Sequence, residues 1–281
     1  EYASIFAKLG VQVPLIDKKE NLLPSIDPEV VEALKKEFQS KGIELILGCD
    51  FEGTRKIKVP SGQTEVRIEL TNCNPCPALS FEAVLYCMGR TGNIEGLNLE
   101  AAGLCANERG LLAVNGSYQT KQPHIYAVGD IIGAPALAAS SAEQGRLAIR
   151  HAFLREEYEF PKTFPYGIYT IPEISSVGVQ ASDLEKAGIP YVSGRAAYNE
   201  LARGKIMRED HGFLKLLVHA ETKKILGVHV IGAQATELVH IGQVAMAFGA
   251  DIYFFLENVF NYPTLAEAYK VAAYNAVNKL R

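Results

Sequence analysis

The stretch Thr120-Lys-Gln-Pro-His-Ile-Tyr-Ala-Val-Gly-Asp130 decides the fold that the sequence predicts. Residues 125–128 form a short apolar run typical of a buried strand, and Gly129 lets another backbone or a ligand come close. Asp130 then stands just beyond the strand's carboxyl end, where open α/β sheets bind their ligands. An alanine-rich helix is predicted over 138–153. A carboxylate beside a helix amino terminus suits a cofactor with hydroxyl or phosphate groups, although a plain helix cap at Asp130 fits the spacing equally well.

The composition is that of a globular protein long enough for roughly two domains. Of the 281 residues, 48% are hydrophobic and 21% are charged, and the net charge is −4. No run approaches the ~20 apolar residues of a membrane span. The negative net charge does not favour binding to the phosphates of nucleic acid. Five cysteines is an odd count, which argues against a secreted disulfide framework. We therefore expect a cytoplasmic protein with no membrane or nucleic-acid partner.

The amino-terminal third alternates helices and strands in the order of a dinucleotide-binding domain. The expected elements are a helix over 1–9, a strand over 11–16, a helix over 28–41, a strand over 43–48, a hairpin over 55–70 and a strand over 81–88. Pro28 suits the first position of its helix, where a missing N–H is harmless. The first helix has neither a cap nor a preceding strand, so we expect an amino-terminal part before Glu1. This order predicts the remnant of a Rossmann-like domain without its glycine-rich loop.

Asp17, Lys18 and Lys19 stand where such a domain reads the adenosine ribose of its nucleotide. A carboxylate accepts hydrogen bonds from a free 2′-hydroxyl, whereas basic side chains pair with a 2′-phosphate. Both chemistries are present, so the choice between NAD and NADP stays open. A solvated charged turn explains the same three residues equally well.

Cys73-Asn-Pro-Cys76 is a C-x-x-C pair, but the sequence favours neither a metal nor a redox role for it. Such roles need a helix start or a second pair of ligands, and Pro75 and Pro77 place this pair in a loop. No metal site is therefore predicted. Cys49, Cys87 and Cys105 are expected to be small apolar fillers.

The character of the chain changes after a proline-bearing linker at 160–165. The expected elements are strands over 167–171, 191–198, 212–219 and 225–231, then helices over 235–248 and 264–280. The last two strands are predicted to form a hairpin. Strands followed by helices indicate an α+β domain, and the apolar stripes of both helices are typical of a core or a subunit interface.

Several segments together resemble the flavoprotein disulfide reductase family, the group of glutathione reductase and dihydrolipoamide dehydrogenase. The most specific are Glu1-Tyr-Ala-Ser-Ile-Phe6, Met88-Gly-Arg-Thr-Gly-Asn93, Tyr126-Ala-Val-Gly-Asp130, Gly167-Ile-Tyr-Thr-Ile-Pro-Glu-Ile-Ser-Ser-Val-Gly178 and Phe260-Asn-Tyr-Pro-Thr-Leu-Ala-Glu-Ala-Tyr269. The resemblance covers essentially the whole chain. It implies an NAD(P)-binding domain over 1–88, the carboxyl part of an FAD-binding domain over 89–158, and an α+β dimerisation domain with an antiparallel sheet over 159–281, and hence a homodimer.

The resemblance also assigns roles to individual residues. Asp130, next to Gly129, would accept a hydrogen bond from a ribityl hydroxyl of FAD, and Ala138 would start the helix whose N–H groups face the flavin. A helix amino terminus stabilises nearby negative charge by ~0.3–2 kcal/mol, which suits a reduced, anionic flavin. The positions that match the family's NAD(P) site are Glu1, Asp17, Lys18, Lys19 and Gly89.

Tyr262 and Glu267 stand where disulfide-reducing relatives carry a His–Glu pair. Dithiol chemistry needs an acid–base group that titrates near neutral pH, and a tyrosine with an ordinary pKa near ~10 does not provide one. We assign no catalytic residue in this chain. The resemblance favours the family's transhydrogenases, which pass hydride between NADPH and NAD⁺ through FAD. The alternatives are a dihydrolipoamide dehydrogenase-like or other disulfide or metal-ion reductase, and a non-catalytic dimerisation and nucleotide-binding fragment.

Overall fold

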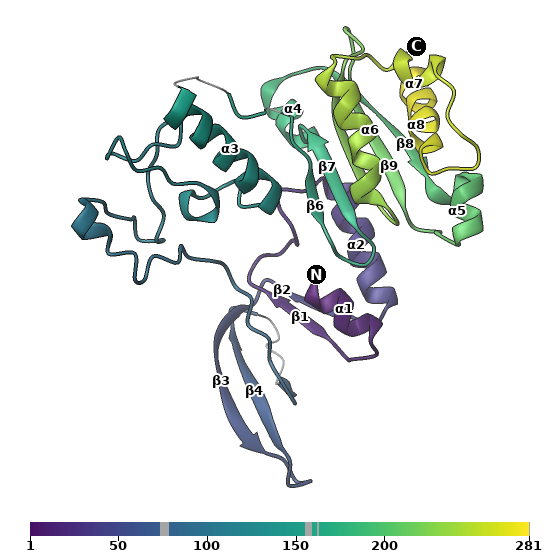
Figure 1. Cartoon of the computed structure of the whole chain (residues 1–281). Coiled ribbons are helices and arrows are strands. Elements are labelled where there is room, and N and C mark those ends of the chain that lie inside the picture. Colours follow the sequence, from purple (N-terminus) through teal and green to yellow (C-terminus); the bar gives the residue numbers. More distant parts are fainter. Residues whose placement is uncertain (74–78, 155–158, 162, 281) are drawn as a thin grey trace. The chain divides into compact units, whose positions relative to one another are not determined.

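The computed structural model describes residues 1–73, 79–154, 159–161 and 163–280. The chain forms two compact units, one of Glu1–Val84 together with Thr163–Arg281, and one of Leu85–Lys162. The first unit thus joins the two ends of the sequence (Figure 1). The mixed α/β architecture with antiparallel sheets agrees with the predicted fold class.

The amino-terminal part of the first unit is a strand–helix–strand element. After α1 (Tyr2–Lys8), β1 (Pro14–Asp17) pairs in parallel with β2 (Glu44–Leu47), and α2 (Pro28–Ser40) connects them. Asp27 caps α2 by accepting a hydrogen bond from the N–H of Glu29 at 3.0 Å, and Pro28 occupies the first turn as expected. The parallel pair is the sheet of the predicted Rossmann remnant.

A three-stranded antiparallel sheet follows, in the order β3 (Asp50–Lys58), β4 (Thr64–Thr71) and β5 (Leu79–Phe81). The hairpin turns at Ser61 and Gly62, as predicted. The strand predicted over 81–88 is wrong, because β5 ends at Phe81. No strand in the described part of the chain pairs with residues 82–88, so their backbone has no ladder to join.

The carboxyl-terminal part of the first unit is built on a five-stranded antiparallel sheet. Its order is β6 (Tyr166–Ile168), β7 (Ile174–Gly178), β10 (Ile225–Ile231), β9 (Phe213–His219) and β8 (Tyr191–Ala197). The sequence predicted all of these strands except β7. Its residues Ile-Ser-Ser-Val-Gly carry too few apolar side chains to stand out, yet β7 is almost entirely buried.

Helices cover both faces of this sheet (Figure 1). On one face, α6 (Ala235–Ala247), α7 (Tyr253–Glu257) and α8 (Glu267–Asn278) enclose a core that includes Tyr198, Phe255 and Tyr269. On the other face, α2 packs its apolar side against the sheet, and the shared core includes Leu34, Phe38, Ile174, Phe213 and Ile231. Short helices α4 (Ala181–Ala187) and α5 (Ala202–Met207) complete the connections.

A charged side chain lies in the middle of the face that α2 covers. Lys215 on β9 is only 4% exposed, and its Nζ donates to Asp27 Oδ2 at 2.9 Å and to Glu29 Oε1 at 2.6 Å. Burial by itself lowers the pKa of Lys215, but the hydrogen bonds to Glu29 and Asp27 raise it above its ordinary value. His229 is the neighbour of Lys215 across the β9–β10 ladder. Lysine 215 is therefore charged, and α2 supplies its counter-charge.

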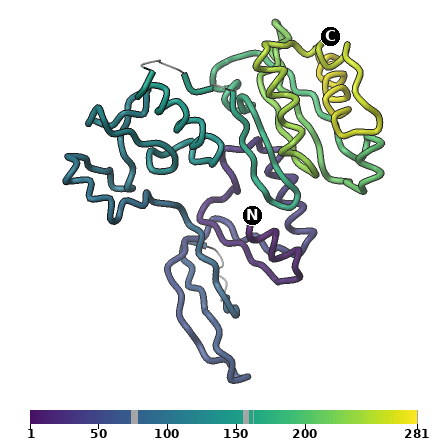
Figure 2. The backbone as a smooth tube through the Cα atoms, in the orientation of Figure 1, coloured from purple at the N-terminus to yellow at the C-terminus, as the bar shows by residue number. Residues whose placement is uncertain are grey.

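The second unit is mostly loop before α3 (Ala138–Leu154), as Figure 2 shows. It also has two short 3₁₀ helices, η1 (Leu99–Ala102) and η2 (Gly129–Ile132). The strand predicted over 125–128 is wrong: in the described residues it makes one isolated bridge, between Gln119 and Tyr126, and no continuous ladder. A small core of Tyr118, Leu147 and Ala148 holds α3 to the preceding loops.

The cysteine predictions fare differently. Cys49 is buried as expected, but Cys87 and Cys105 are exposed, so they are not apolar fillers. Cys76, half of the C-x-x-C pair, lies outside the described residues.

Within the described ranges, no cluster of three potential metal ligands occurs. Likewise, none of the described helices combines the length and the apolar character that crossing a membrane requires.

Substituting Gly194 tests the contact between α8 and β8. A methyl group there would overlap the carbonyl oxygen of Ala272 and lie 2.7 Å from Cβ of Ala276, both on α8. We expect Gly194→Ala to lower the free energy of unfolding by about 1–3 kcal/mol, because overpacking forces the backbones apart. Gly145 on α3 has open space around it, so Gly145→Ala is the matched control and should raise stability by about 0.5–1 kcal/mol. Urea denaturation measures both, and equal effects would contradict the packing described.

Protonation of His229 should set part of the pH dependence of stability. Burial lowers the pKa of His229, which is 1% exposed, although the Asp27 carboxylate opposes the shift. Below pH ~6.5, His229 therefore binds a proton in the unfolded chain but stays neutral in the folded chain. The free energy of unfolding then falls by up to about 1.4 kcal/mol for each pH unit. His229→Gln should flatten the loss between pH 7.5 and 5.5 in urea titrations. His240→Gln, at an exposed position on α6, should leave the slope unchanged; the same slope in all three proteins would contradict the assignment.

Candidate functional site

Gly129 and Asp130 are held directly against the start of α3. Gly129 is buried with φ +80°, and its N–H donates to Gln144 Oε1 at 2.7 Å. A methyl group at Gly129 would meet Ser141 Oγ at 3.2 Å, so only glycine fits this close approach without strain. Asp130 follows at the surface, in the first turn of η2. Among the described residues, the hydrogen bond of its carboxylate is to Arg90 and not to an N–H of α3.

Arg90 bridges Asp130 and the chain that enters α3. Its Nη1 donates to Asp130 Oδ2 at 2.8 Å, and its Nη2 donates to the carbonyl oxygen of Ala136 at 3.3 Å. One guanidinium thus spans both groups and places the carboxylate beside the helix amino terminus. Both side chains are exposed, 70% for Arg90 and 56% for Asp130, so the pair is open to solvent. The sequence predicted a site role for Gly89 but none for its neighbour Arg90.

The amino end of α3 is exposed at its first two residues. Ala138 is the first helical residue, as predicted, and Ala138 and Ala139 are both exposed. The N–H of Leu137 is satisfied by Ser140 Oγ at 3.3 Å, whereas the first helical N–H groups have no carbonyl partner within their own helix. The Asp130 carboxylate, a hydrogen-bond acceptor, is thus linked through Arg90 to the chain that enters the positive end of α3. These residues fit a ligand with a hydroxylated chain and an electron-rich ring edge, such as FAD.

The predicted nucleotide residues divide between the two units. Asp17 ends β1 and is half-buried; its Oδ1 accepts the N–H of Lys19 at 2.9 Å, which makes a tight turn. Lys18 and Lys19 are exposed beside it. Glu1 precedes α1, and its Oε1 accepts the N–H of Tyr169 at 2.8 Å. Gly89, exposed with φ +74°, belongs to the second unit together with Asp130.

Tyr262 and Glu267 do not form the pair that disulfide chemistry would require. Tyr262 is 74% exposed, in the loop before α8. Glu267 is the first residue of α8, and its Oε2 accepts the N–H of Thr264 at 3.4 Å. The carboxylate therefore serves the helix start, and no contact joins it to Tyr262 among the interactions of the described residues.

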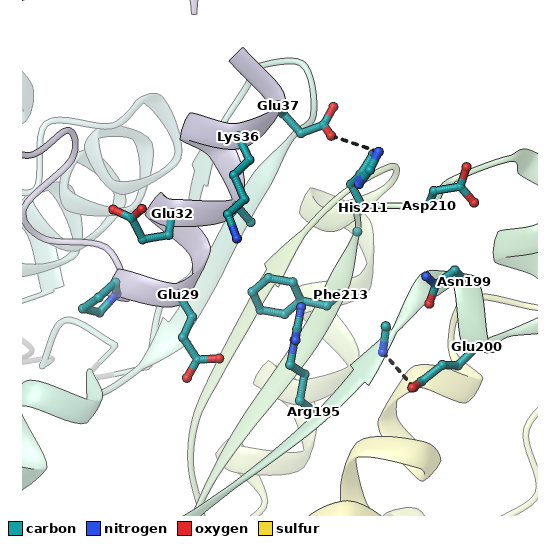
Figure 3. A pocket seen from close by; sticks show the side chains of 14 residues that line it. Glu29, Glu32, Lys36, Glu37, Arg195, Asn199, Glu200, Asp210, His211 and Phe213 are labelled. Atoms are coloured by element: carbon teal, nitrogen blue, oxygen red, sulfur yellow. Dashed lines mark hydrogen bonds and ion pairs between the residues drawn. The ribbon is translucent and has the colours of Figure 1, made fainter. Parts of the chain in front are cut away.

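A cavity of about 690 Å³ lies elsewhere, between α2 and the ends of β8 and β9 (Figure 3). Its walls carry the carboxylates of Glu29, Glu32, Glu37, Glu200 and Asp210. The guanidinium carbon of Arg195 lies 4.2 Å from the ring centroid of Phe213, and His211 Nε2 lies 3.5 Å from Glu37 Oε1. None of the residues predicted from the sequence lines this cavity. Its walls carry both signs of charge and no residue of the predicted site, so we assign it no ligand.

The chain matches one protein family along most of its length. Residues 1–145 match the description "Pyridine nucleotide-disulphide oxidoreductase", and residues 164–273 match the dimerisation domain of the same family. Its relatives include the soluble pyridine nucleotide transhydrogenases of Mycobacterium bovis, 47% identical over 281 residues, and of Yersinia enterocolitica, 45% identical over 285 residues. Each alignment covers 100% of this chain, and the chain spans 58% and 59% of the length of these relatives.

Solved structures agree with this match. LpdA from Mycobacterium tuberculosis superposes with a TM-score of 0.85 at 25% identity, over 98% of this chain and 58% of that chain. The HOCl-induced flavoprotein disulfide reductase RclA from Escherichia coli gives a TM-score of 0.87 over 97% of this chain and 61% of that chain; at 23% identity it supports the fold alone. With sequence matches over both parts of the chain and the fold in agreement, the chain belongs to the pyridine nucleotide-disulphide oxidoreductase family.

Proposed function

We propose that the full-length gene product is an FAD-dependent oxidoreductase that passes hydride between NADPH and NAD⁺ through the flavin. The observation that carries the proposal is the identity of 44–47% to relatives named soluble pyridine nucleotide transhydrogenase, maintained over all of this chain. FAD and NAD(P) are the cofactors of this family, as the sequence predicted. When bound, FAD supplies the hydride chemistry, and the protein's part is to bind, orient and stabilise.

The proposed domain division follows the sequence: an NAD(P)-binding domain over 1–88, the carboxyl part of an FAD-binding domain over 89–158, and a dimerisation domain over 159–281. Two observations support it. The compact unit Leu85–Lys162 has nearly the limits of the proposed FAD part, and the dimerisation match starts at residue 164.

Asp130 is proposed to accept a hydrogen bond from a ribityl hydroxyl of FAD. The exposed carboxylate and its place beside α3 support this role. Gly129 would let the cofactor approach the backbone, and the N–H groups at Ala138 would stabilise negative charge on the flavin edge. Arg90 would have to release Asp130 Oδ2, or share the carboxylate, when the hydroxyl binds.

The nicotinamide nucleotide is proposed to bind at Asp17, Lys18 and Lys19, with Glu1 near the nicotinamide, and Gly89 is a further residue proposed for NAD(P) binding. The exposed lysines suit a 2′-phosphate, and Asp17 Oδ2 remains for a ribose hydroxyl while Oδ1 holds the turn. The proposed site would thus offer a hydrogen-bond acceptor, Asp17, to the free 2′-hydroxyl of NADH. It would offer hydrogen-bond donors, Lys18 and Lys19, to the 2′-phosphate of NADPH. An enzyme that uses both nucleotides needs both kinds of group.

Tyr262 separates the proposed activity from the alternative, a dihydrolipoamide dehydrogenase-like or other disulfide reductase. The fold shared with a flavoprotein disulfide reductase, at 23% identity, does not decide between the two activities. Hydride transfer between two nicotinamides needs no general base for a dithiol, whereas disulfide turnover does. Tyr262 is solvent-exposed and has no carboxylate partner among the described residues, which supports the former.

A homodimer through the carboxyl-terminal domain is also proposed, with the protein in the cytoplasm. The dimerisation-domain match supports the dimer, and so do large apolar side chains that stand exposed there, among them Val244, Phe248 and Val259. Exposed apolar patches of this kind are typical of interaction surfaces.

Purified full-length protein should reduce thio-NAD⁺ with NADPH and show no lipoamide reduction. Tyr262→Phe should keep kcat within about threefold, because a general acid–base group is worth ~10²–10⁴-fold where one operates and none is needed here. Steady-state absorbance assays measure both. Lipoamide turnover without thio-NAD⁺ reduction would refute the transhydrogenase proposal.

Asp130→Ala should weaken FAD binding by about 10- to 100-fold, because a hydrogen bond to a charged group contributes ~1.5–3 kcal/mol. The unfolding free energy of the apoprotein should change by less than about 1 kcal/mol, since the Arg90–Asp130 pair is exposed. Arg90→Met is the matched control: it breaks the same pair but keeps the carboxylate, so FAD binding should be retained. Fluorescence of released flavin reports affinity, and equal losses in both variants would contradict the role of Asp130.

A further inference from the structure

The segment of residues 17–27, here named the recognition segment, connects the proposed nucleotide residues to α2. It begins with Asp17, Lys18 and Lys19 at the end of β1 and finishes with Asp27, the cap of α2. The position of its first residues depends on what fixes both of its ends. The inference below rests on the nucleotide role proposed for those residues.

The near end of the recognition segment is fixed by the parallel sheet. The N–H of Cys49 donates to the carbonyl oxygen of Asp17 at 3.3 Å, and the N–H of Gly48 donates to that of Lys19 at 3.2 Å. Within the turn, the N–H of Lys19 donates to Asp17 Oδ1. These contacts set the backbone at the nucleotide residues but leave the rest of the segment to other partners.

The far end is fixed by residues 155 and 188 positions later in the chain. Asp27 is fully buried; its Oδ1 caps α2, and its Oδ2 accepts Nζ of Lys215 at 2.9 Å. Gln180 Nε2 donates to the carbonyl oxygen of Ser25 at 2.7 Å. Both Lys215 and Gln180 lie within the dimerisation-domain match, residues 164–273. Residues of the dimerisation-domain match, one on β9 and one before α4, therefore hold the end of the segment that the parallel sheet does not.

Burial makes this anchor rigid. Leu22 and Ile26 of the recognition segment are 7% and 6% exposed and belong to the core that includes Ile174 and Phe213. A shift of the segment would separate Asp27 from Lys215 and leave the buried Asp27 carboxylate without its cation, which is strongly unfavourable, although Lys215 would keep Glu29. The Lys215 and Gln180 contacts therefore restrict where the segment can lie.

We propose that Lys215 and Gln180 are positioning residues for nucleotide recognition: they fix the recognition segment so that Asp17, Lys18 and Lys19 meet the adenosine ribose and its 2′-substituent. Neither residue touches the nucleotide. The dimerisation domain thereby contributes to nucleotide selectivity as well as to subunit association.

Gln180 gives the cleaner probe of this role. It occupies the position before α4, but its side chain does not cap that helix. Its Oε1 is buried and has no hydrogen-bond partner among the described residues, so the side chain's recorded bond is the one to Ser25. Gln180→Met keeps the length of the side chain and removes that bond. Lys215→Met is the stronger variant, and Lys215→Arg restores the charge.

The test compares these variants in the full-length protein. In Gln180→Met, amide hydrogen exchange over residues 18–26 should speed up, and KM for NADPH should rise by about tenfold with kcat nearly unchanged, because a displaced binding group weakens binding and a 1 Å error can cost ~10²-fold. The ratio of NADPH to NADH affinity, measured by nucleotide fluorescence, should fall. Lys215→Met should show the same changes more strongly, and Lys215→Arg should partly reverse them.

Lys186→Met is the matched control, because Lys186 is an exposed lysine of α4 that lies 4.0 Å from Asp183. It should change neither exchange nor nucleotide affinity. Asp17→Asn and Lys19→Met test the underlying nucleotide role. If Asp17→Asn and Lys19→Met alter nucleotide affinity but Gln180→Met leaves affinity and hydrogen exchange as in the wild type, the positioning role is refuted and the nucleotide role stands. If neither direct variant has an effect, the nucleotide assignment and the positioning role both fail.

Discussion

A charged lysine buried on a sheet face needs a carboxylate as its partner. In this protein the partner on the face that α2 covers is Asp27, which accepts a hydrogen bond from Lys215. The pairing dictates how α2 lies on the five-stranded sheet, because Asp27 is at once the partner of the lysine and the cap of the helix. Apolar side chains of α2 then pack around the pair, with Leu34 and Phe38 against Phe213 and Ile231. The hydrophobic core supplies most of the attraction, and the ion pair selects one arrangement of it.

The second unit follows a similar logic with exposed groups. Gly129 brings the backbone against Ser141 of α3, which leaves Asp130 at the surface beside the helix start. Arg90 holds the carboxylate there without burying it. The contrast with Lys215 is informative: a buried ion pair fixes structure, whereas an exposed one contributes little to stability and leaves its carboxylate available for a ligand.

The sequence predicts what depends on neighbours along the chain. Pro28 in the first turn of α2, the hairpin turn at Ser61–Gly62 and the start of α3 at Ala138 are local signals, and each is where it was expected. The strands predicted over 81–88 and 125–128 are wrong because a strand needs a partner, and an apolar run does not specify one. The partners of the site residues were missed for the same reason, since Arg90 is 40 residues from Asp130 and Lys215 is 188 residues from Asp27.

The distance of Asp27 from Lys215 along the chain also orders events during synthesis. α2 leaves the ribosome long before β9 and β10 exist, so Leu34 and Phe38 have no sheet to cover them while about two thirds of the chain is still being made. The parallel pair of β1 and β2 can form early, but its helix can dock only after residue 231 has emerged. Contacts of such large sequence separation form slowly, because the intervening chain must close first. The apolar face of α2 thus stays uncovered until the other end of the protein arrives to complete its core.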